Sequence, residues 1–121
     1  MSVLRLKRGD TLQLAVGPVL KADGSVQDIT GHTLRFSAKD RSTDLDNAAI
    51  LSGAIGSGIT ITNGPAGLAL VVIATAAVTV PTNTGFRVLL WDVQIADPAG
   101  VTRTLDSGKL IIERDVTQTS P

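Results

Sequence analysis

The residues of this chain that could do chemistry are few and stand apart in the sequence. The single histidine, His32, lies in the segment DITGHTLRF, where a turn enters a strand, and histidine is the most frequent acid–base catalyst. No partner motif accompanies it, so a surface histidine at a strand edge is the favoured interpretation. Cysteine is absent, which excludes disulfides, thiolate metal sites and a thiol nucleophile.

A cluster of carboxylates occurs in the polar segment 40–47. Asp40, Asp44 and Asp46 could together hold a hard cation such as calcium, which binds several oxygen ligands on flexible loops. The ligand spacing of an EF-hand, its glycine and its closing glutamate are all missing. A solvated loop is therefore favoured, and we expect no metal and no other cofactor.

Other catalytic signatures are incomplete. Residues 107–109 read SGK, as in a phosphate-binding loop, but the position that requires a glycine, five residues before Gly108, holds Arg103. Glycosidase chemistry needs two carboxylates across a cleft, whereas the chain has one glutamate, Glu113, and its aspartates mostly fall in turns. A G-x-S-x-G nucleophile motif does not occur. We therefore expect that the protein is not an enzyme.

Composition also disfavours two classes of binding protein. Lysine plus arginine and aspartate plus glutamate both number 11, so the formal net charge is zero and nucleic acid is not an expected partner. Aromatic residues make up 2% of the chain, and alternation places Phe36 and Trp91 on the core-facing sides of strands. Few aromatic rings are then left to stack on bases or sugars.

Alternation of apolar and polar residues is the dominant pattern, and it predicts half-buried strands. In TLRFSAK, for example, Leu34, Phe36 and Ala38 share one face and the polar residues share the other. Turn signals recur about every ten residues, a spacing typical of β-sandwiches. The sequence predicts an all-β, immunoglobulin-like antiparallel β-sandwich of about seven or eight strands. At most one short helical turn is expected, near residues 75–80.

One domain is expected over residues 1–116, because no linker or internal repeat interrupts the pattern, and residues 117–121 are expected to form a flexible tail. The start of the chain lacks the apolar region of a signal peptide. Residues 66–80 are apolar, but this stretch is shorter than the ~20 residues that a membrane helix needs. It is predicted to be a buried strand that leads into a short connection, so no membrane span is expected.

The strand around Trp91, the only tryptophan, departs from simple alternation. Trp91 shares its face with aliphatic residues alone, so this face should point into the core. The opposite face carries Val88 and Leu90 before it becomes polar from Asp92 onward. A late strand likewise has an aliphatic residue, Ile111, on its outer side. Two strands therefore place aliphatic side chains where an isolated domain is usually polar.

Two explanations of these outer aliphatic residues stay open. If the two strands are neighbours, Leu90 and Ile111 form one apolar patch, and such patches commonly mark interfaces. Alternatively, the N-terminal segment of the chain covers them. The first strand, VLRLK, could also pair with an edge of another protein through its backbone groups. The candidate interface residues are Val3, Arg5, Val88, Leu90 and Ile111.

Four segments, taken in order, resemble a known family. They are LKRGDTLQL at 6–14, DGSVQDITGHTLRFSAKD at 23–40, GLALVVIATAAVTVP at 67–81 and WDVQIADPAGVTRTLDSGKLIIERDVT at 91–117. The chain resembles small virion-associated proteins of tailed phages that have an immunoglobulin-like β-sandwich, similar to the attachment domains of baseplate upper proteins. The family usually has a tyrosine where this chain has Trp91, which keeps a large amphipathic ring.

The resemblance implies a structural role in a phage particle and no enzymatic activity. We expect an accessory protein of the capsid, for decoration or cementing, that forms a homo-oligomer in the assembly and binds other virion proteins. The alternative is an adaptor of the tail, neck, baseplate or fibre, and a more remote one is a carbohydrate-binding or adhesion module for the host surface. The expected location is the virion, with assembly in the host cytoplasm, and neither nucleic acid nor membrane is an expected partner.

Overall fold

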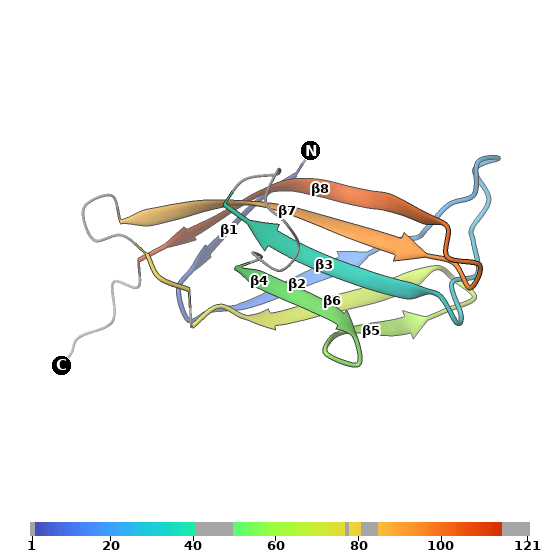
Figure 1. Ribbon diagram of the computed structural model, residues 1–121, viewed down its shortest axis with the longest axis horizontal. Coiled ribbons are helices and arrows are strands. Elements are labelled where there is room, and N and C mark those ends of the chain that lie inside the picture. Colours follow the sequence, from blue (N-terminus) through green and yellow to red (C-terminus); the bar gives the residue numbers. More distant parts are fainter. Residues whose placement is uncertain (1, 41–49, 77, 81–84, 115–121) are drawn as a thin grey trace.

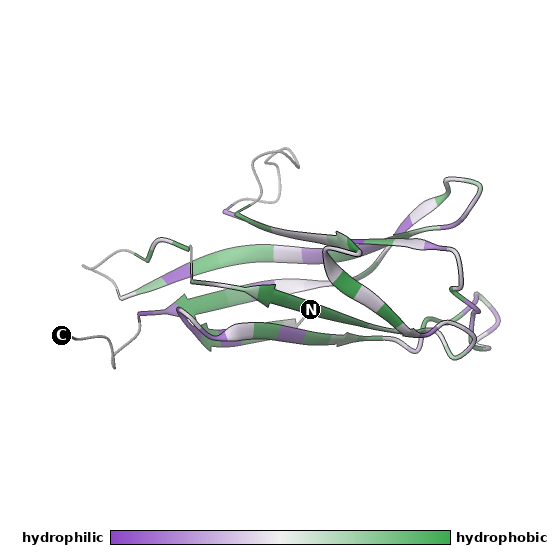
Figure 2. Ribbon diagram, turned by 90° about the horizontal axis from the view of Figure 1, so that it is seen from below, coloured by the Kyte–Doolittle hydropathy of each residue, from purple (hydrophilic) through white to green (hydrophobic). Residues whose placement is uncertain are grey.

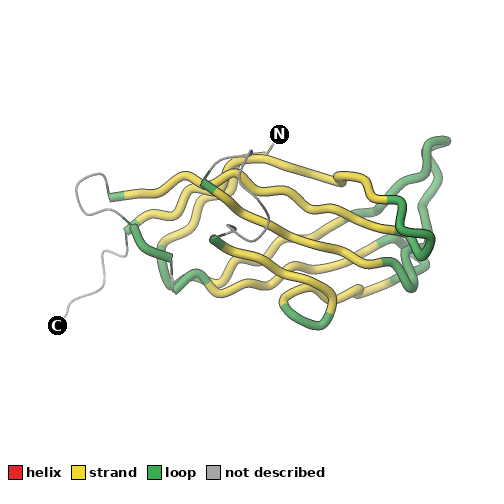
Figure 3. The backbone as a smooth tube through the Cα atoms, viewed as in Figure 1, coloured by secondary structure: helices red, strands yellow, loops and turns green. Residues whose placement is uncertain are grey.

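The computed structural model describes residues 2–40, 50–76, 78–80 and 85–114, which form eight strands and no helix (Figure 1, Figure 3). The strands are β1 (Ser2–Lys7), β2 (Thr11–Val16), β3 (Thr33–Lys39), β4 (Leu51–Ile55), β5 (Gly58–Asn63), β6 (Leu68–Ala74), β7 (Phe86–Ala96) and β8 (Thr102–Glu113). The prediction of an all-β fold with seven or eight strands is confirmed. The tail 117–121 and most of the polar segment 40–47 lie outside the described residues.

The eight strands form one continuous sheet that folds over on itself (Figure 1, Figure 2). Neighbouring strands follow the order β1-β8-β7-β3-β4-β5-β6-β2. The half made by β1, β8, β7 and β3 faces the half made by β5, β6 and β2, and β4 leads from one half to the other. The apolar side chains between the two halves form the core, as in a β-sandwich.

Five of the seven strand pairings between described residues are antiparallel. The exceptions are β1 with β8 and a short pairing of β4 with β5, both parallel. Alternation in a sequence indicates which side chains share a face, but it carries no information on the direction of the neighbouring strand. Because β1 and β8 are the first and last strands, no hairpin forces them to run in opposite directions.

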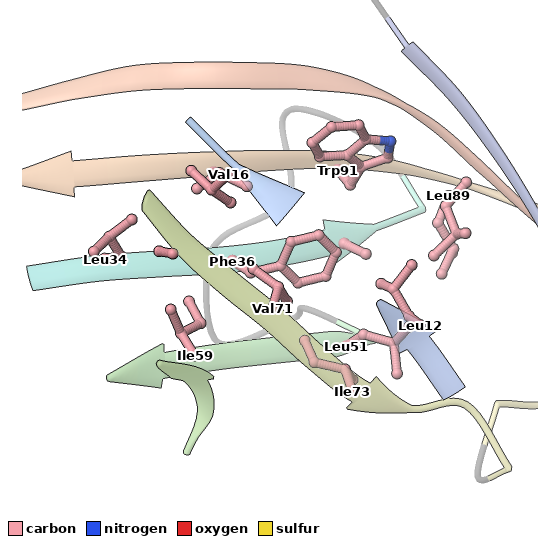
Figure 4. Close-up of a cluster of buried hydrophobic side chains, with 14 of the residues drawn as sticks. Leu12, Val16, Leu34, Phe36, Leu51, Ile59, Val71, Ile73, Leu89 and Trp91 are labelled. Atoms are coloured by element: carbon pink, nitrogen blue, oxygen red, sulfur yellow. The ribbon is translucent and has the colours of Figure 1, made fainter. Parts of the chain in front are cut away.

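The core contains two stacked aromatic rings, Phe36 of β3 and Trp91 of β7 (Figure 4). Their ring centroids lie 6.1 Å apart, with an angle of 24° between the planes. The indole N–H of Trp91 donates a hydrogen bond to the backbone carbonyl of Lys109 in β8, at 3.1 Å. Trp91 is thus the core anchor that the sequence predicts, and alternation directs the neighbouring Asp92 to the opposite face.

The connection after β6 is bonded to the turn between β1 and β2. A hydrogen bond from the Val78 N–H to the Thr75 carbonyl, at 3.1 Å, makes a turn here, and the described residues of segment 75–80 form no helix. The Thr75 side chain is fully buried. Its hydroxyl donates to the Asp10 carbonyl at 2.6 Å and accepts the Gly9 N–H at 3.2 Å. One hydroxyl therefore fastens the β1–β2 turn to the end of β6.

We expect Trp91→Ala to lower the free energy of unfolding by about 3–5 kcal/mol, because it removes a ring packed against Phe36 and leaves a cavity. Chemical denaturation followed by circular dichroism measures this loss. Val101→Ala is the control, since Val101 is 66% exposed and should change stability by less than about 0.5 kcal/mol. A loss for Trp91→Ala as small as that of the control would contradict the core position of the ring.

Thr75→Val should destabilise the domain by about 1 kcal/mol, because it keeps the side-chain shape but removes two part-buried hydrogen bonds to the backbone of the β1–β2 turn. The same substitution at the exposed Thr60 of β5 is the matched control. Denaturation midpoints of the two variants, measured side by side, test the expectation. Equal midpoints would show that the bonds from the Thr75 hydroxyl to the β1–β2 turn do not stabilise the domain.

Candidate docking surface

The outward face of β1, β8 and β7 carries the aliphatic residues that the sequence places outside the core. The strands that bear Leu90 and Ile111 are neighbours, as the patch hypothesis requires. Val88 lies directly opposite Ile111 in the β7–β8 pairing, and Ile111 lies opposite Arg5 in the β1–β8 pairing. Arg5, Ile111 and Val88 therefore form one row of side chains across three strands.

A second row runs beside the first. Leu90 lies opposite Lys109, and Lys109 lies opposite Val3. Because side chains two residues apart on a strand share a face, the two rows belong to one surface. All five candidate interface residues thus come together on this surface, from three different strands.

Phe86, at the start of β7, belongs to the same surface and is missing from the sequence-based prediction. It lies opposite Glu113, one row beyond Val88 and Ile111. Alternation carries the signal that could have found it, since Phe86, Val88 and Leu90 share one face of their strand. We define the outer patch as Val3, Phe86, Val88, Leu90 and Ile111.

Solvent reaches the side chains of the outer patch to different degrees. Val3 is 60%, Phe86 47% and Val88 37% exposed. Leu90 and Ile111 are half-buried. Singly exposed apolar residues are common on protein surfaces, so the grouping of these side chains on neighbouring strands, and not the exposure of any one, suggests an interface.

The N-terminal segment does not cover the outer patch. β1 pairs edge to edge with Gly108–Glu113 of β8 and so lies beside the other strands, as a continuation of the sheet (Figure 1). It adds Val3 and Arg5 to the outer surface, while Leu4 and Leu6 pack against the core. The explanation that this segment shields the outer aliphatic residues is therefore wrong.

Basic side chains predominate around the outer patch. Arg5, Lys7 and Lys109 occupy alternate positions of β1 and β8 on this face, and Lys39 lies in the β3 position next to β7. Glu113 forms an ion pair with Arg5 at 3.7 Å, and the two side chains are 37% and 59% exposed. An ion pair this exposed contributes little to stability. Arg5 and Glu113 can therefore exchange partners when another charged surface approaches.

A hollow of about 280 Å³ opens beside Leu90 on the same face. Leu90, Asp92, Ser37 and Ser107 contribute to its walls. The outer surface thus combines apolar side chains that stand out with a depression next to them. Interfaces commonly bury an anchor side chain of one partner in such a depression of the other.

His32 lies away from the outer patch, in the turn that precedes β3. Its ring nitrogens lie 3.1 Å from the Gln27 side-chain nitrogen and 3.5 Å from the Thr30 carbonyl. In the same turn, hydrogen bonds from the Thr30 side chain and N–H hold the pKa of the Asp28 carboxyl below its usual range. These contacts organise a turn, and they match the interpretation of His32 as a residue at the end of a strand.

The carboxylate cluster is described only in part, because Asp44 and Asp46 lie outside the described residues. Asp40 accepts two hydrogen bonds from the Arg87 guanidinium, at 3.1 Å and 2.9 Å. Within the described ranges, histidines and acids form no group of three that could hold a metal ion. Residues 107–109, which read SGK, lie inside β8 and do not form a loop.

No protein-family model matches this sequence, and no curated protein matches it. The part of the chain that the structure describes contains no helix that is long and apolar enough to cross a membrane.

We expect Val88→Asp and Leu90→Asp to leave the domain folded, because at both positions the new carboxylate remains in contact with water. Leu89→Asp, the matched control on the same strand, should unfold it, since Leu89 is fully buried and burying an unpaired carboxylate costs several kcal/mol. Thermal melts followed by circular dichroism distinguish the two outcomes. If Leu90→Asp unfolds the domain as Leu89→Asp does, the outer patch is covered from within the chain.

Proposed function

We propose that this chain is a structural protein of a phage virion, an accessory module of the capsid that binds a larger symmetric assembly through its outer patch. The outer patch is the observation that carries the proposal, because it joins apolar side chains of three strands on a face with a basic rim. An attachment function needs a surface of this kind, whereas an enzyme needs a cleft with convergent catalytic groups.

The order of the strands supports the immunoglobulin-like part of the resemblance. In such sandwiches, the second, fifth and fourth strands form one layer and the third, sixth and seventh form the other. We take β4 as the additional strand that variable-type domains place in the layer of the third, sixth and seventh strands, and leave it out of the count. With β2 as the second strand, the second, fifth and fourth are then β2, β6 and β5, which lie together, and the third, sixth and seventh are β3, β7 and β8, which also lie together. The likeness concerns the fold, and the function rests on the outer patch.

A surface of modest size that binds weakly can still attach a protein to a symmetric particle, because many copies bind at once. A single small patch gives low affinity, but simultaneous attachment of several linked copies raises the overall affinity strongly. The same reasoning holds for a tail, neck, baseplate or fibre, so the experiment has to separate the head from these sites.

Purified heads and purified tails of the phage that encodes the chain are each incubated with labelled protein and sedimented. We expect saturable binding to heads, and at least about tenfold weaker binding by Val88→Asp, because a charge in an apolar contact opposes its desolvation. The exposed Val101→Asp is the matched control and should bind like the original chain. Binding to tails alone would overturn the capsid assignment.

The carbohydrate-binding alternative predicts a different experimental result. Saturable binding to glycans, combined with absence of the protein from purified particles by mass spectrometry, would overturn the structural role. Val88→Asp again separates the two cases, since the outer patch presents little aromatic surface for a sugar ring and should not govern glycan binding.

A further inference from the structure

A second surface feature lies between the two ends of the folded sheet. A groove of about 400 Å³ separates β2 and its following residues from the first half of β8. One wall consists of consecutive residues from Leu14 to Leu20, and the other of consecutive residues from Arg103 to Asp106. Both walls are therefore stretches of backbone that run along the groove.

The strand edges on both walls lack a neighbouring strand among the described residues. β8 pairs with β7 along its whole length, but β1 pairs only with Gly108–Glu113 and leaves Thr102–Ser107 without a second neighbour. β2 pairs with β6 and with no other described strand. In an antiparallel pair, the backbone groups of alternate residues point away from the partner strand. The edges of β2 and of the first half of β8 thus offer N–H and C=O groups to a further strand, whereas the backbone groups of Val19 already bond to Gly67 and Gln27.

Apolar side chains form the deeper part of the groove. Val16 and Val93 are buried there, and Leu14 and Leu105 are only partly buried although they pack against the core. The pairing of β7 with β8 shifts register between Val93 and Gln94, so Leu105 is the extra residue of a bulge. The bulge changes the direction of side chains in this half of β8, and it accounts for the presence of Leu105 in the groove.

The carboxylate of Asp106 gives the groove a preference for positive charge. Its oxygen accepts the N–H of Ser107 at 2.8 Å, and among the described residues no cation lies within ion-pair distance of it. The guanidinium of Arg103 is already occupied, because it donates to the Leu20 carbonyl at 2.9 Å and to the Gln27 side chain at 2.8 Å. Both acceptors are neutral, so Arg103 keeps its positive charge, but its guanidinium is held at the Leu20 end of the groove. Asp106 is therefore the charged side chain that is left to contact an occupant farther along the groove.

The two ends of the groove determine how an occupant would lie. Arg103 bridges from β8 to Leu20 and closes one end. At the other end, the groove wall stops at Asp106 of β8. The pairing of β1 with β8 begins two residues later, where Ser2 lies opposite Gly108. The groove is thus in line with β1, and a segment placed in it would extend the row that β1 occupies along β8.

We propose that this groove accepts a short extended segment of another protein, which adds as a strand between β2 and the first half of β8. The segment presents aliphatic side chains to Leu14 and Leu105 and a lysine or arginine to Asp106. Backbone hydrogen bonds to a strand edge provide affinity in this mode, and the alternate side chains provide specificity. The groove is separate from the outer patch, so this inference does not rest on the proposed function.

The test uses the complete chain, labelled with ¹⁵N, and a synthetic peptide with blocked ends and the sequence SVLRLK. This peptide is the probe because it has the sequence of β1, which alternates aliphatic and basic residues and already pairs with β8. We expect saturable shifts and slower hydrogen exchange at the amides of Leu14–Val16 and Arg103–Asp106. The amides of Phe86–Leu90, in the outer patch, should not change.

Asp106→Lys should weaken the binding of this peptide about fivefold, because it replaces an ion pair at a partly screened site with a repulsion. Thr62→Lys, at an exposed position of β5, is the control and should leave binding unchanged. Thermal melts of both variants verify that they are folded. Equal binding by Asp106→Lys and the original chain would overturn the charge assignment.

Two other results would overturn the proposal itself. Shifts restricted to β1 and to Leu110–Glu113 would show that the peptide replaces β1 instead of entering the groove. Protection of the groove amides without peptide, rising with protein concentration, would show that a second copy of the chain fills the groove.

Discussion

The packing of Trp91 on Phe36 is the contact on which the arrangement of the outer surface depends. It joins β7 to β3, and the hydrogen bond from the indole to the Lys109 carbonyl joins β7 to β8. A shift of one residue in either pairing would turn every side chain of a strand to the opposite face. The large ring fits the core in one register only, because close-packed interiors tolerate little change in volume. The aliphatic residues of the outer patch point outward because that ring points inward.

Much of this fold could be predicted from the sequence, because alternation is a local property. It assigns Phe36 and Trp91 to the core and Val88 and Leu90 to the outer side, and the structure agrees at all four positions. Alternation persists even where the outer side is apolar, since what repeats is the geometry of the strand and not the polarity of its residues.

The features that could not be predicted depend on contacts between distant parts of the chain. The parallel pairing of β1 with β8 joins residues more than a hundred positions apart, and no local pattern specifies it. The same pairing places Val3 in the outer patch and Arg5 beside it, and it leaves the first half of β8 without a second neighbouring strand among the described residues. The bulge at Leu105 and the bonds of Arg103 to Leu20 are likewise set by neighbours from other segments. The sequence therefore identified the strands and their faces, while the composition of each surface depends on how the strands meet.

The pairing of the first strand with the last also has a consequence for how the domain forms. Contacts between residues this distant along the chain close a long loop, which costs entropy and slows folding. Among the described strands, β1 pairs with β8 alone, and much of it is exposed, so it is expected to dock late and to open early in native-state fluctuations. Because β1 supplies Val3 of the outer patch and Arg5 of its basic rim, this surface is complete only while the strand is docked. A partner that contacts all three strands would therefore hold the two ends of the domain together, so attachment and the closure of the fold become one linked equilibrium.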